Sequence, residues 1–261
     1  MPKLASPIVS VDWLVAHIED PAVVIADVRP LDAYLAGHIP GAISVDLSML
    51  RLPSSAEATV AAWSQRLVSF VAAIGSGPDK TVVFYEDFSG TMSAYGVWLL
   101  DAAGLGNGAM LDGGIRAWYE AGNAVADDQA EPVAAEIGVE PDLAVLQLAD
   151  QIVAGLSDGS GAQLVDARGI HEYKMGAIPG AVHVEWMNNL NASGAFRPVD
   201  ELEQLYAGLD KDAPVASYCA GGIRAANTYV VLKSLGFSDA RNYAPSWGEW
   251  GSHPGTPKER P

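Results

Sequence analysis

The single cysteine of the chain lies where it could act as a nucleophile. Cys219 follows the apolar run "PVASY" and precedes a short loop before a helical pattern, the loop being Ala220, Gly221, Gly222 and Ile223. The two glycines allow successive N–H groups to point inward, and the helix N-terminus adds a partial positive charge. Arg224 adds a full charge at the start of the helix. These features favour the thiolate, so the loop predicts a partly accessible catalytic Cys219 that could hold a persulfide or a small anion.

A buried, inert cysteine beside a tight Gly-Gly turn is the alternative interpretation, because free cysteines are commonly buried. The position of Cys219 between a strand and a helix favours the catalytic interpretation. In parallel α/β folds, ligands bind near the carboxyl ends of strands, and Cys219 is at such an end.

The chain contains an internal repeat. Residues 23–46, "VVIADVRPLDAYLAGHIPGAISVD", resemble residues 162–185, "AQLVDARGIHEYKMGAIPGAVHVE", at a constant displacement. Residues 80–105 also resemble residues 213–237, which pairs Cys219 with Glu86. A carboxylate is no sulfur nucleophile, and we do not expect it to occupy an anion cradle. One half is therefore predicted to be catalytic and the other inactive.

Each half is predicted to be an α/β domain. Short apolar runs such as "TVVFYE" and "PVASYC" are typical of parallel strands buried on both faces, and helical patterns separate them. The predicted fold is two tandem domains, each a parallel sheet flanked by helices. We expect an N-terminal domain over residues 1–125, a linker over 126–141, where the composition is acidic and contains prolines, and a catalytic domain over 142–261.

Composition limits the partners and the compartment. The 261-residue chain is 49% apolar and carries a net charge of −17, which disfavours nucleic acid and anionic membranes. The chain has no run of 18 apolar residues, so no membrane-spanning helix is predicted. The first residues lack the basic and apolar pattern of a signal peptide. One cysteine cannot form an intramolecular disulfide, which fits the cytoplasm. No cofactor is expected, and the scattered His171, His183 and His253 lack the spacing of metal ligands.

At this point the chain resembles the tandem-domain rhodaneses, the thiosulfate/3-mercaptopyruvate sulfurtransferase family. The resemblance covers nearly all of both halves. It rests on "DVR" with "GHIPGA" and "LDGGIRAW" in the first half, and on "DAR", "IPGA", "CAGGIR" and "SWGEW" in the second. It implies that Cys219 accepts a sulfane sulfur, becomes a persulfide and passes the sulfur to a thiophilic acceptor such as cyanide, a thiol or a sulfur-acceptor protein.

Departures from the family pattern bear on the sulfur donor. Mercaptopyruvate enzymes of the family usually have a serine two residues after the cysteine, where this chain has Gly221. They also have a second arginine, which binds the keto-acid carboxylate, four residues after the arginine of "DAR", where this chain has Glu172. His38 and Asp27 match a histidine and an aspartate proposed to assist mercaptopyruvate cleavage. We expect a small anionic donor such as thiosulfate, with 3-mercaptopyruvate as the alternative.

Two arginines are predicted to bind the donor. Arg224 is at the start of the helix and is expected to lie near the sulfur, whereas Arg168 could either bind an anion or pair with Asp166 in the core. The counterpart Arg29 in the predicted inactive half gives weight to the structural role. The amides of the loop from Ala220 to Ile223 complete the predicted site, and Trp247 and Trp250 are predicted to pack.

Two further classes stay open at this stage. Cysteine phosphatases and arsenate reductases also surround an oxyanion with a Cys-loop-Arg, but five residues separate their cysteine and arginine, against four here. The shorter loop favours a sulfur-sized group over phosphate. A non-catalytic rhodanese-like binding module is the other alternative, and the presence of Cys219 disfavours it.

Overall fold

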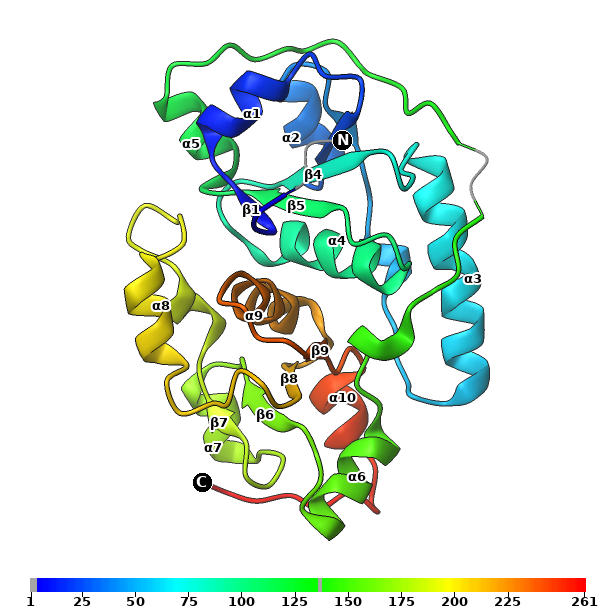
Figure 1. Cartoon of the computed structure of the whole chain (residues 1–261), viewed down its shortest axis with the longest axis vertical. Helices are drawn as coiled ribbons and strands as arrows, with labels where there is room; N and C mark the ends of the chain where they lie inside the picture. Colours follow the sequence, from blue (N-terminus) through cyan, green and yellow to red (C-terminus); the bar gives the residue numbers. More distant parts are fainter. Residues whose placement is uncertain (1–3, 136–137) are drawn as a thin grey trace. The chain divides into compact units, whose positions relative to one another are not determined.

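A computed structural model describes residues 4–135 and 138–261 (Figure 1). These residues form two compact units. The first unit takes in residues 1–50, 64–142 and 191–196, and the second takes in 51–63, 143–190 and 197–261. The main division, between Asp142 and Leu143, falls at the end of the predicted linker, of which positions 136 and 137 lie outside the described residues.

The sheet of the first unit is parallel and five-stranded, in the order β1-β5-β4-β2-β3. Its strands are β1 (Ile8–Val9), β2 (Val23–Asp27), β3 (Ile43–Ser44), β4 (Thr81–Tyr85) and β5 (Gly108–Leu111). Every residue of β4 is buried, as expected for a central strand covered on both faces.

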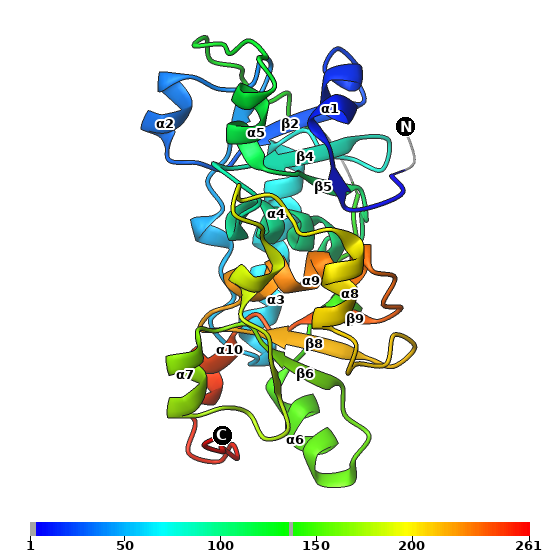
Figure 2. The same cartoon turned by 90° about the vertical axis from the view of Figure 1, so that its left-hand side faces the viewer.

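Helices cover both faces of this sheet, with α1 and α5 on one side and α4 on the other (Figure 2). The helices of this unit include α1 (Val11–His17), α2 (Leu31–Ala36), α4 (Thr91–Ala102) and α5 (Gly114–Glu120), while α3 (Glu57–Ala73) has its first turns in the second unit. Leu14 and Trp118 pack against Val83 and Tyr85 of β4 in a buried cluster. The amphipathic helices are thus held by burial of one apolar face.

The second unit repeats this design with a parallel four-stranded sheet in the order β7-β6-β8-β9. Its strands are β6 (Gln163–Asp166), β7 (Val182–His183), β8 (Val215–Tyr218) and β9 (Ala240–Asn242). Its helices are α6 (Ala149–Asp158), α7 (Ile170–Met175), α8 (Val199–Leu205), α9 (Ile223–Ser234) and α10 (Ser246–Trp250). Short 3-10 turns are η1 (Ser48–Leu50), η2 (Leu143–Val145) and η3 (Trp186–Asn189).

Helix α10 is anchored in the core of the second unit by Trp250. Trp250 is fully buried beside Tyr218 of β8 and Ile152 of α6. The Trp250 indole N–H also donates to Pro257 O at 2.8 Å, so its one polar group is satisfied inside the core. This packing matters for function because α10 contacts the loop that follows β8.

Each unit includes a short segment from the other half of the sequence. Residues 51–63 belong to the second unit, where the Glu249 carboxylate accepts hydrogen bonds from Ser55 N at 2.6 Å and Ser54 Oγ at 3.0 Å. Residues 191–196 belong to the first unit, where Gly194 O accepts from Ser89 N at 2.8 Å. The sequence did not predict this exchange.

The predicted fold class is confirmed, since two separate parallel sheets flanked by helices are present. The domain boundaries at 125 and 142 stay a prediction. The sequence analysis did not identify α1, α6 or α7, which have ten residues or fewer and short apolar patterns. Among residues 4–135 and 138–261 no helix is long and apolar enough to cross a bilayer.

Candidate active site

The loop after β8 has the backbone geometry that places Cys219 at the start of α9. Gly222 caps α9 with φ +85°, a left-handed conformation that favours glycine. A Cβ on Gly222 would lie 2.6 Å from Ala244 O, so a side chain has no room there. Asn242 Nδ2 donates to Gly222 O at 3.0 Å, which fixes the turn from the neighbouring strand β9.

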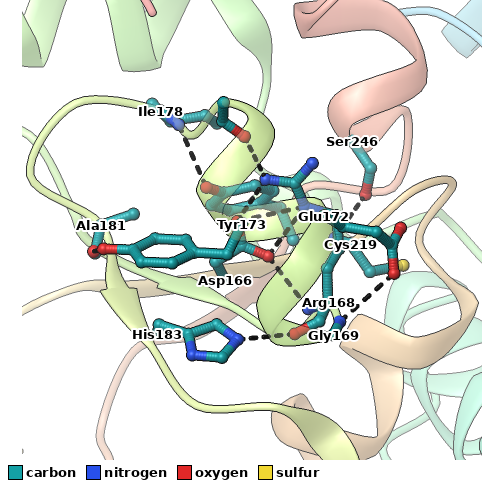
Figure 3. A network of polar contacts seen from close by, with 12 residues as sticks. Asp166, Arg168, Gly169, Glu172, Tyr173, Ile178, Ala181, His183, Cys219 and Ser246 are labelled. Atoms are coloured by element: carbon teal, nitrogen blue, oxygen red, sulfur yellow. Dashed lines mark hydrogen bonds and ion pairs between the residues drawn. The ribbon is translucent and has the colours of Figure 1, made fainter. Parts of the chain in front are cut away.

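Helix α10 fixes the cysteine loop through backbone hydrogen bonds. The amides of Trp247 and Gly248 donate to Cys219 O at 3.0 Å and Ala220 O at 2.9 Å. Cys219 N donates to Ser246 Oγ at 3.1 Å (Figure 3). The Ser246 hydroxyl in turn donates to Tyr243 O at 2.6 Å. The position of the cysteine is therefore set by three hydrogen bonds to a helix packed in the core.

Ser246 has unusual backbone geometry. Among residues 4–135 and 138–261 it is the one non-glycine residue with a positive φ, at +57°. This conformation is costly for a residue with a Cβ, and it persists because the side chain is fully buried and hydrogen-bonded. Such strain beside a candidate nucleophile is typical of functional sites.

The amides of the loop remain open to a ligand. Within the part of the chain that the structure describes, no backbone oxygen accepts a hydrogen bond from the N–H groups of residues 220–225. They lie at the N-terminus of the twelve-residue helix α9. The loop can therefore donate several hydrogen bonds to an anion held beside the sulfur.

The thiol itself is buried, with 1% of Cys219 exposed. Ala167 and Ala225 pack around it, and Trp186 of η3 packs against the same cluster. The expectation of a partly accessible sulfur was therefore wrong, because these side chains cover it while Ala220, next in the chain, is exposed.

Arg224 is close to the sulfur, but it is paired. Its Nη1 and Nη2 donate to the two carboxylate oxygens of Glu172 at 2.6 and 2.8 Å. The bonds to Glu172 raise the pKa of Arg224, burial lowers it, and the charge of Cys219 contributes a further increase. The prediction that Arg224 faces the sulfur has support from this interaction, whereas its pairing with Glu172 was not foreseen.

Arg168 lies in a fully packed position. Its Nη2 contacts Asp166 Oδ2 at 2.5 Å and Gly176 O at 2.7 Å, and the guanidinium stacks on the Trp247 ring at 4.4 Å. The side chain is 2% exposed. The structure gives Arg168 the packing role that the sequence left open, and offers no support for anion binding by it.

The same arrangement occurs in the first unit, where no cysteine is present. Arg29 Nη2 contacts Asp27 at 2.6 Å and Gly37 O at 2.8 Å. In both units a tyrosine hydroxyl accepts from the isoleucine amide of the Ile-Pro-Gly-Ala motif, Tyr85 from Ile39 and Tyr218 from Ile178, each at 3.1 Å. The repeated motifs are therefore explained by folding.

The loop of the first unit is filled by Glu86. Its Oε1 accepts from Met92 N at 2.8 Å, Ser93 N at 2.9 Å and Ser93 Oγ at 3.1 Å. The expectation that a carboxylate would not occupy such a cradle was wrong, because the open amides at the start of α4 donate hydrogen bonds to it. Burial nevertheless raises the pKa of Glu86, against the lowering effect of these hydrogen bonds.

His183 has structural partners in the second unit. His183 Nε2 lies 2.7 Å from Arg168 O, and its ring stacks on Tyr173 at 4.6 Å between centroids. Among residues 4–135 and 138–261 there is no group of three histidine, cysteine or acidic side chains that could hold a metal ion.

Three residues near the loop escaped the sequence analysis. Ser246 lies in the quoted motif "SWGEW", which could have indicated it, and Trp186 lies in a segment without a pattern. Arg51 lies beside Gly221 in the second unit although it comes from the first half of the sequence. No sequence signal could have connected positions so far apart.

Comparison with known proteins identifies the fold and its relatives. The model of the rhodanese-like domain matches residues 10–121 and again 148–253. A thiosulfate sulfurtransferase of Azotobacter vinelandii is 30% identical over 94% of each chain, and the sulfur carrier protein TtuD of Thermus thermophilus is 29% identical over 96% of this chain and 95% of its own.

Solved structures agree at the level of the fold. The 3-mercaptopyruvate sulfurtransferase SseA of Escherichia coli superposes with a TM-score of 0.77 at 23% identity, over 93% of this chain and 99% of its own. The family model matches the chain twice, the single cysteine lies in the second copy, and the relatives match over nearly their full length. All three observations point to the same family. The chain belongs to the rhodanese family and is a rhodanese-type sulfurtransferase.

Proposed function

We propose that the enzyme transfers the outer sulfur of thiosulfate through a persulfide on Cys219. The observation that carries this proposal is the set of open amides at residues 220–225, in the loop that follows Cys219 and at the start of α9. Thiosulfate is a compact dianion, and these donors suit its oxygens without a dedicated carboxylate clamp. The relative from Azotobacter vinelandii, named a thiosulfate sulfurtransferase, supports the same donor.

The reaction balances without a cofactor. The Cys219 thiolate attacks the outer sulfur of thiosulfate, and the sulfur–sulfur bond breaks with its electron pair leaving on sulfite. The product is a Cys219 persulfide anion. An acceptor nucleophile such as cyanide then attacks the terminal sulfur, which forms thiocyanate and restores the thiolate.

The loop contributes to both half-reactions. In this mechanism its open amides donate hydrogen bonds to the negative charge that accumulates on the sulfur atoms and on departing sulfite, and this preorganised field stabilises the transition state. The hydrogen bonds from α10 keep the loop in that geometry. Ser246 acts as a positioning residue, since it touches the backbone of Cys219 and not the sulfur.

The site is poorly suited to a keto acid. Glu172 holds Arg224 and adds negative charge where a carboxylate would need a partner, and Gly221 offers no hydroxyl. We therefore place 3-mercaptopyruvate second among donors. The structural likeness to SseA concerns the fold alone.

The physiological acceptor is proposed to be a thiol or a sulfur-acceptor protein. The relative named a sulfur carrier protein supports passage of the persulfide sulfur to another protein. We also propose a cytoplasmic location, since a single thiol that must stay reduced suits that compartment.

The test compares donors in steady state, with cyanide as acceptor and thiocyanate as the measured product. We expect a higher kcat/KM for thiosulfate than for 3-mercaptopyruvate, and mass spectrometry should show one added sulfur on the wild type and none on Cys219→Ser. A clear preference for 3-mercaptopyruvate would reject the donor, and turnover of an aryl phosphate would reject the reaction class.

A further inference from the structure

We propose that Arg51 is a further donor-binding residue, which supplies the uncompensated positive charge at the mouth of the cysteine loop. This inference rests on the proposed use of an anionic sulfur donor. The guanidinium of Arg51 lies against the loop: a Cβ built on Gly221 would be 2.6 Å from Nη2 and 3.7 Å from Cζ of Arg51.

Arg51 is free to bind a ligand. Its side chain is exposed, and it makes no hydrogen bond or ion pair with the residues described in ranges 4–135 and 138–261. Arg224, by contrast, is bound through both terminal nitrogens to Glu172. An incoming dianion therefore finds one arginine already neutralised and one whose charge is available.

The carboxylates near the loop make this second charge necessary. Glu172 and Glu185 both lie beside Gly169, because a Cβ there would be 3.6 Å from Glu172 Oε2 and 3.7 Å from Glu185 Oε1. A second carboxylate thus lies close to Glu172, which already pairs with Arg224. The charge of Arg51 offsets the excess negative charge of these three groups, which would otherwise repel thiosulfate.

The backbone holds Arg51 in place over the loop. Leu52 is buried, and Ser55, four residues after Arg51, donates to Glu249 through both its amide and its hydroxyl, at 2.6 and 2.7 Å. Ser55 Oγ also accepts from Ala149 N at 3.1 Å. Glu249 belongs to α10, the helix whose amides fix the cysteine loop, so one element positions both partners.

Gly221 has a role in this arrangement. Its missing side chain leaves the space that the Arg51 guanidinium occupies. A serine at position 221 would displace the guanidinium, so Gly221 and Arg51 should act together on donor binding. We expect Arg51→Ala and Gly221→Ser to be non-additive, because either change removes the same contact.

The first measurement is steady-state turnover of thiosulfate with cyanide. Arg51→Ala should raise KM about tenfold with little change in kcat, as expected for one charged hydrogen bond made equally in ground and transition states, and Arg51→Lys should recover part of the loss. Arg66→Ala is the matched control, because Arg66 is an exposed arginine of α3 and its loss changes the net charge equally.

The second measurement does not depend on thiosulfate. Iodoacetate is anionic and iodoacetamide is neutral, so the ratio of their rates of alkylation of Cys219 reports positive charge near the sulfur and cancels changes in access. Arg51→Ala should lower this ratio several-fold, and Arg66→Ala should leave it unchanged.

Together, the two measurements test the proposed donor and the proposed role of Arg51 separately. If the wild type does not use thiosulfate, the proposed donor is wrong, and the alkylation ratio alone decides the role of Arg51. If Arg51→Ala changes neither KM nor the ratio beyond the Arg66→Ala control, the inference about Arg51 is overturned while the sulfurtransferase assignment stands.

Discussion

The loop after β4 and the loop after β8 have the same place in the fold but differ in what occupies them. Both leave a buried strand and enter a twelve-residue helix through a glycine cap, Gly90 in the first unit and Gly222 in the second. In the first loop the carboxylate of Glu86 satisfies the amides that open the helix. In the second a small thiol leaves those amides free. An open anion site therefore requires that the chain supply no anion of its own.

The comparison also separates structural from functional arginines. Arg29 and Arg168 make the same contacts in both units, to an aspartate two residues earlier and to a glycine carbonyl eight residues later. Features that both copies share serve the fold. Features confined to the second copy, such as Arg224 with Glu172, are candidates for chemistry.

Exchange of the two loop residues should have the largest effect. Cys219→Ser should lower thiosulfate turnover about a thousandfold or more, because the hydroxyl cannot form a persulfide. Adding Glu86→Cys to that variant should restore nothing, since the second residue of α4 is Met92 where α9 has Arg224. Thiocyanate formation is the measurement. Activity of the double variant would show that the first loop needs only a thiol.

Loss of Arg224 should have the next largest effect. Arg224→Ala removes the charge beside the sulfur, and we expect kcat/KM for thiosulfate to fall about 10- to 100-fold. Arg197→Ala is the matched control, because Arg197 also pairs with a glutamate, Glu201, but on the surface at 2.9 Å. Equal losses in both variants would show a general effect of charge.

Glu172→Gln should have a smaller effect of opposite sign. Without the carboxylate, Arg224 is less compensated, so KM for thiosulfate should fall several-fold at pH 7. The hydrogen bond from Arg224 holds the pKa of Glu172 below its ordinary value, so the wild type keeps this carboxylate ionised at neutral pH.

The sign of the pH dependence follows from that lowered pKa. The stabilising effect of ionised Glu172 is present above its unfolded pKa of about 4.3 and is lost as the pH falls through the folded value. The KM difference between wild type and Glu172→Gln should therefore persist across neutral pH. A higher KM in Glu172→Gln would instead mean that Glu172 is needed to orient Arg224.

The sequence predicted what local patterns encode. The repeat and the alternation of strands and helices predicted the fold, which is confirmed, and the strand–loop–helix around Cys219 made it the proposed nucleophile. Each of these patterns depends on residues near one another in the chain. The cover of the sulfur by Trp186 and the position of Arg51 depend on long-range packing. No periodicity or spacing in the sequence reports such packing.

The two errors have a common physical source. The filling of the first loop by Glu86 was missed because hydrogen bonds from helix amides can hold a partly buried carboxylate. The burial of Cys219 was missed because the loop sequence says nothing about side chains packed from other elements. In both cases local sequence specified the backbone and tertiary contacts decided what occupied it.

Glu86→Gln should have the smallest effect on activity and the clearest effect on stability. The amide keeps an oxygen that can accept from Met92 N and Ser93 N but cannot ionise. Because burial raises the pKa of Glu86, its stabilising contribution is full below the unfolded pKa of about 4.3 and is lost as pH rises through the folded value. The wild type should therefore lose stability relative to Glu86→Gln from acidic to neutral pH, while thiosulfate turnover stays within about twofold.

Denaturant unfolding of both proteins across this pH range measures the difference. Glu86→Ala is the companion variant: it leaves two amides without an acceptor and should lower the free energy of unfolding by about 1–3 kcal/mol at every pH. A wild type that gains stability relative to Glu86→Gln as pH rises would mean that the amides at the start of α4 outweigh burial. The first loop would then be a true anion site occupied by its own carboxylate, and the two loops would differ only in the origin of the anion.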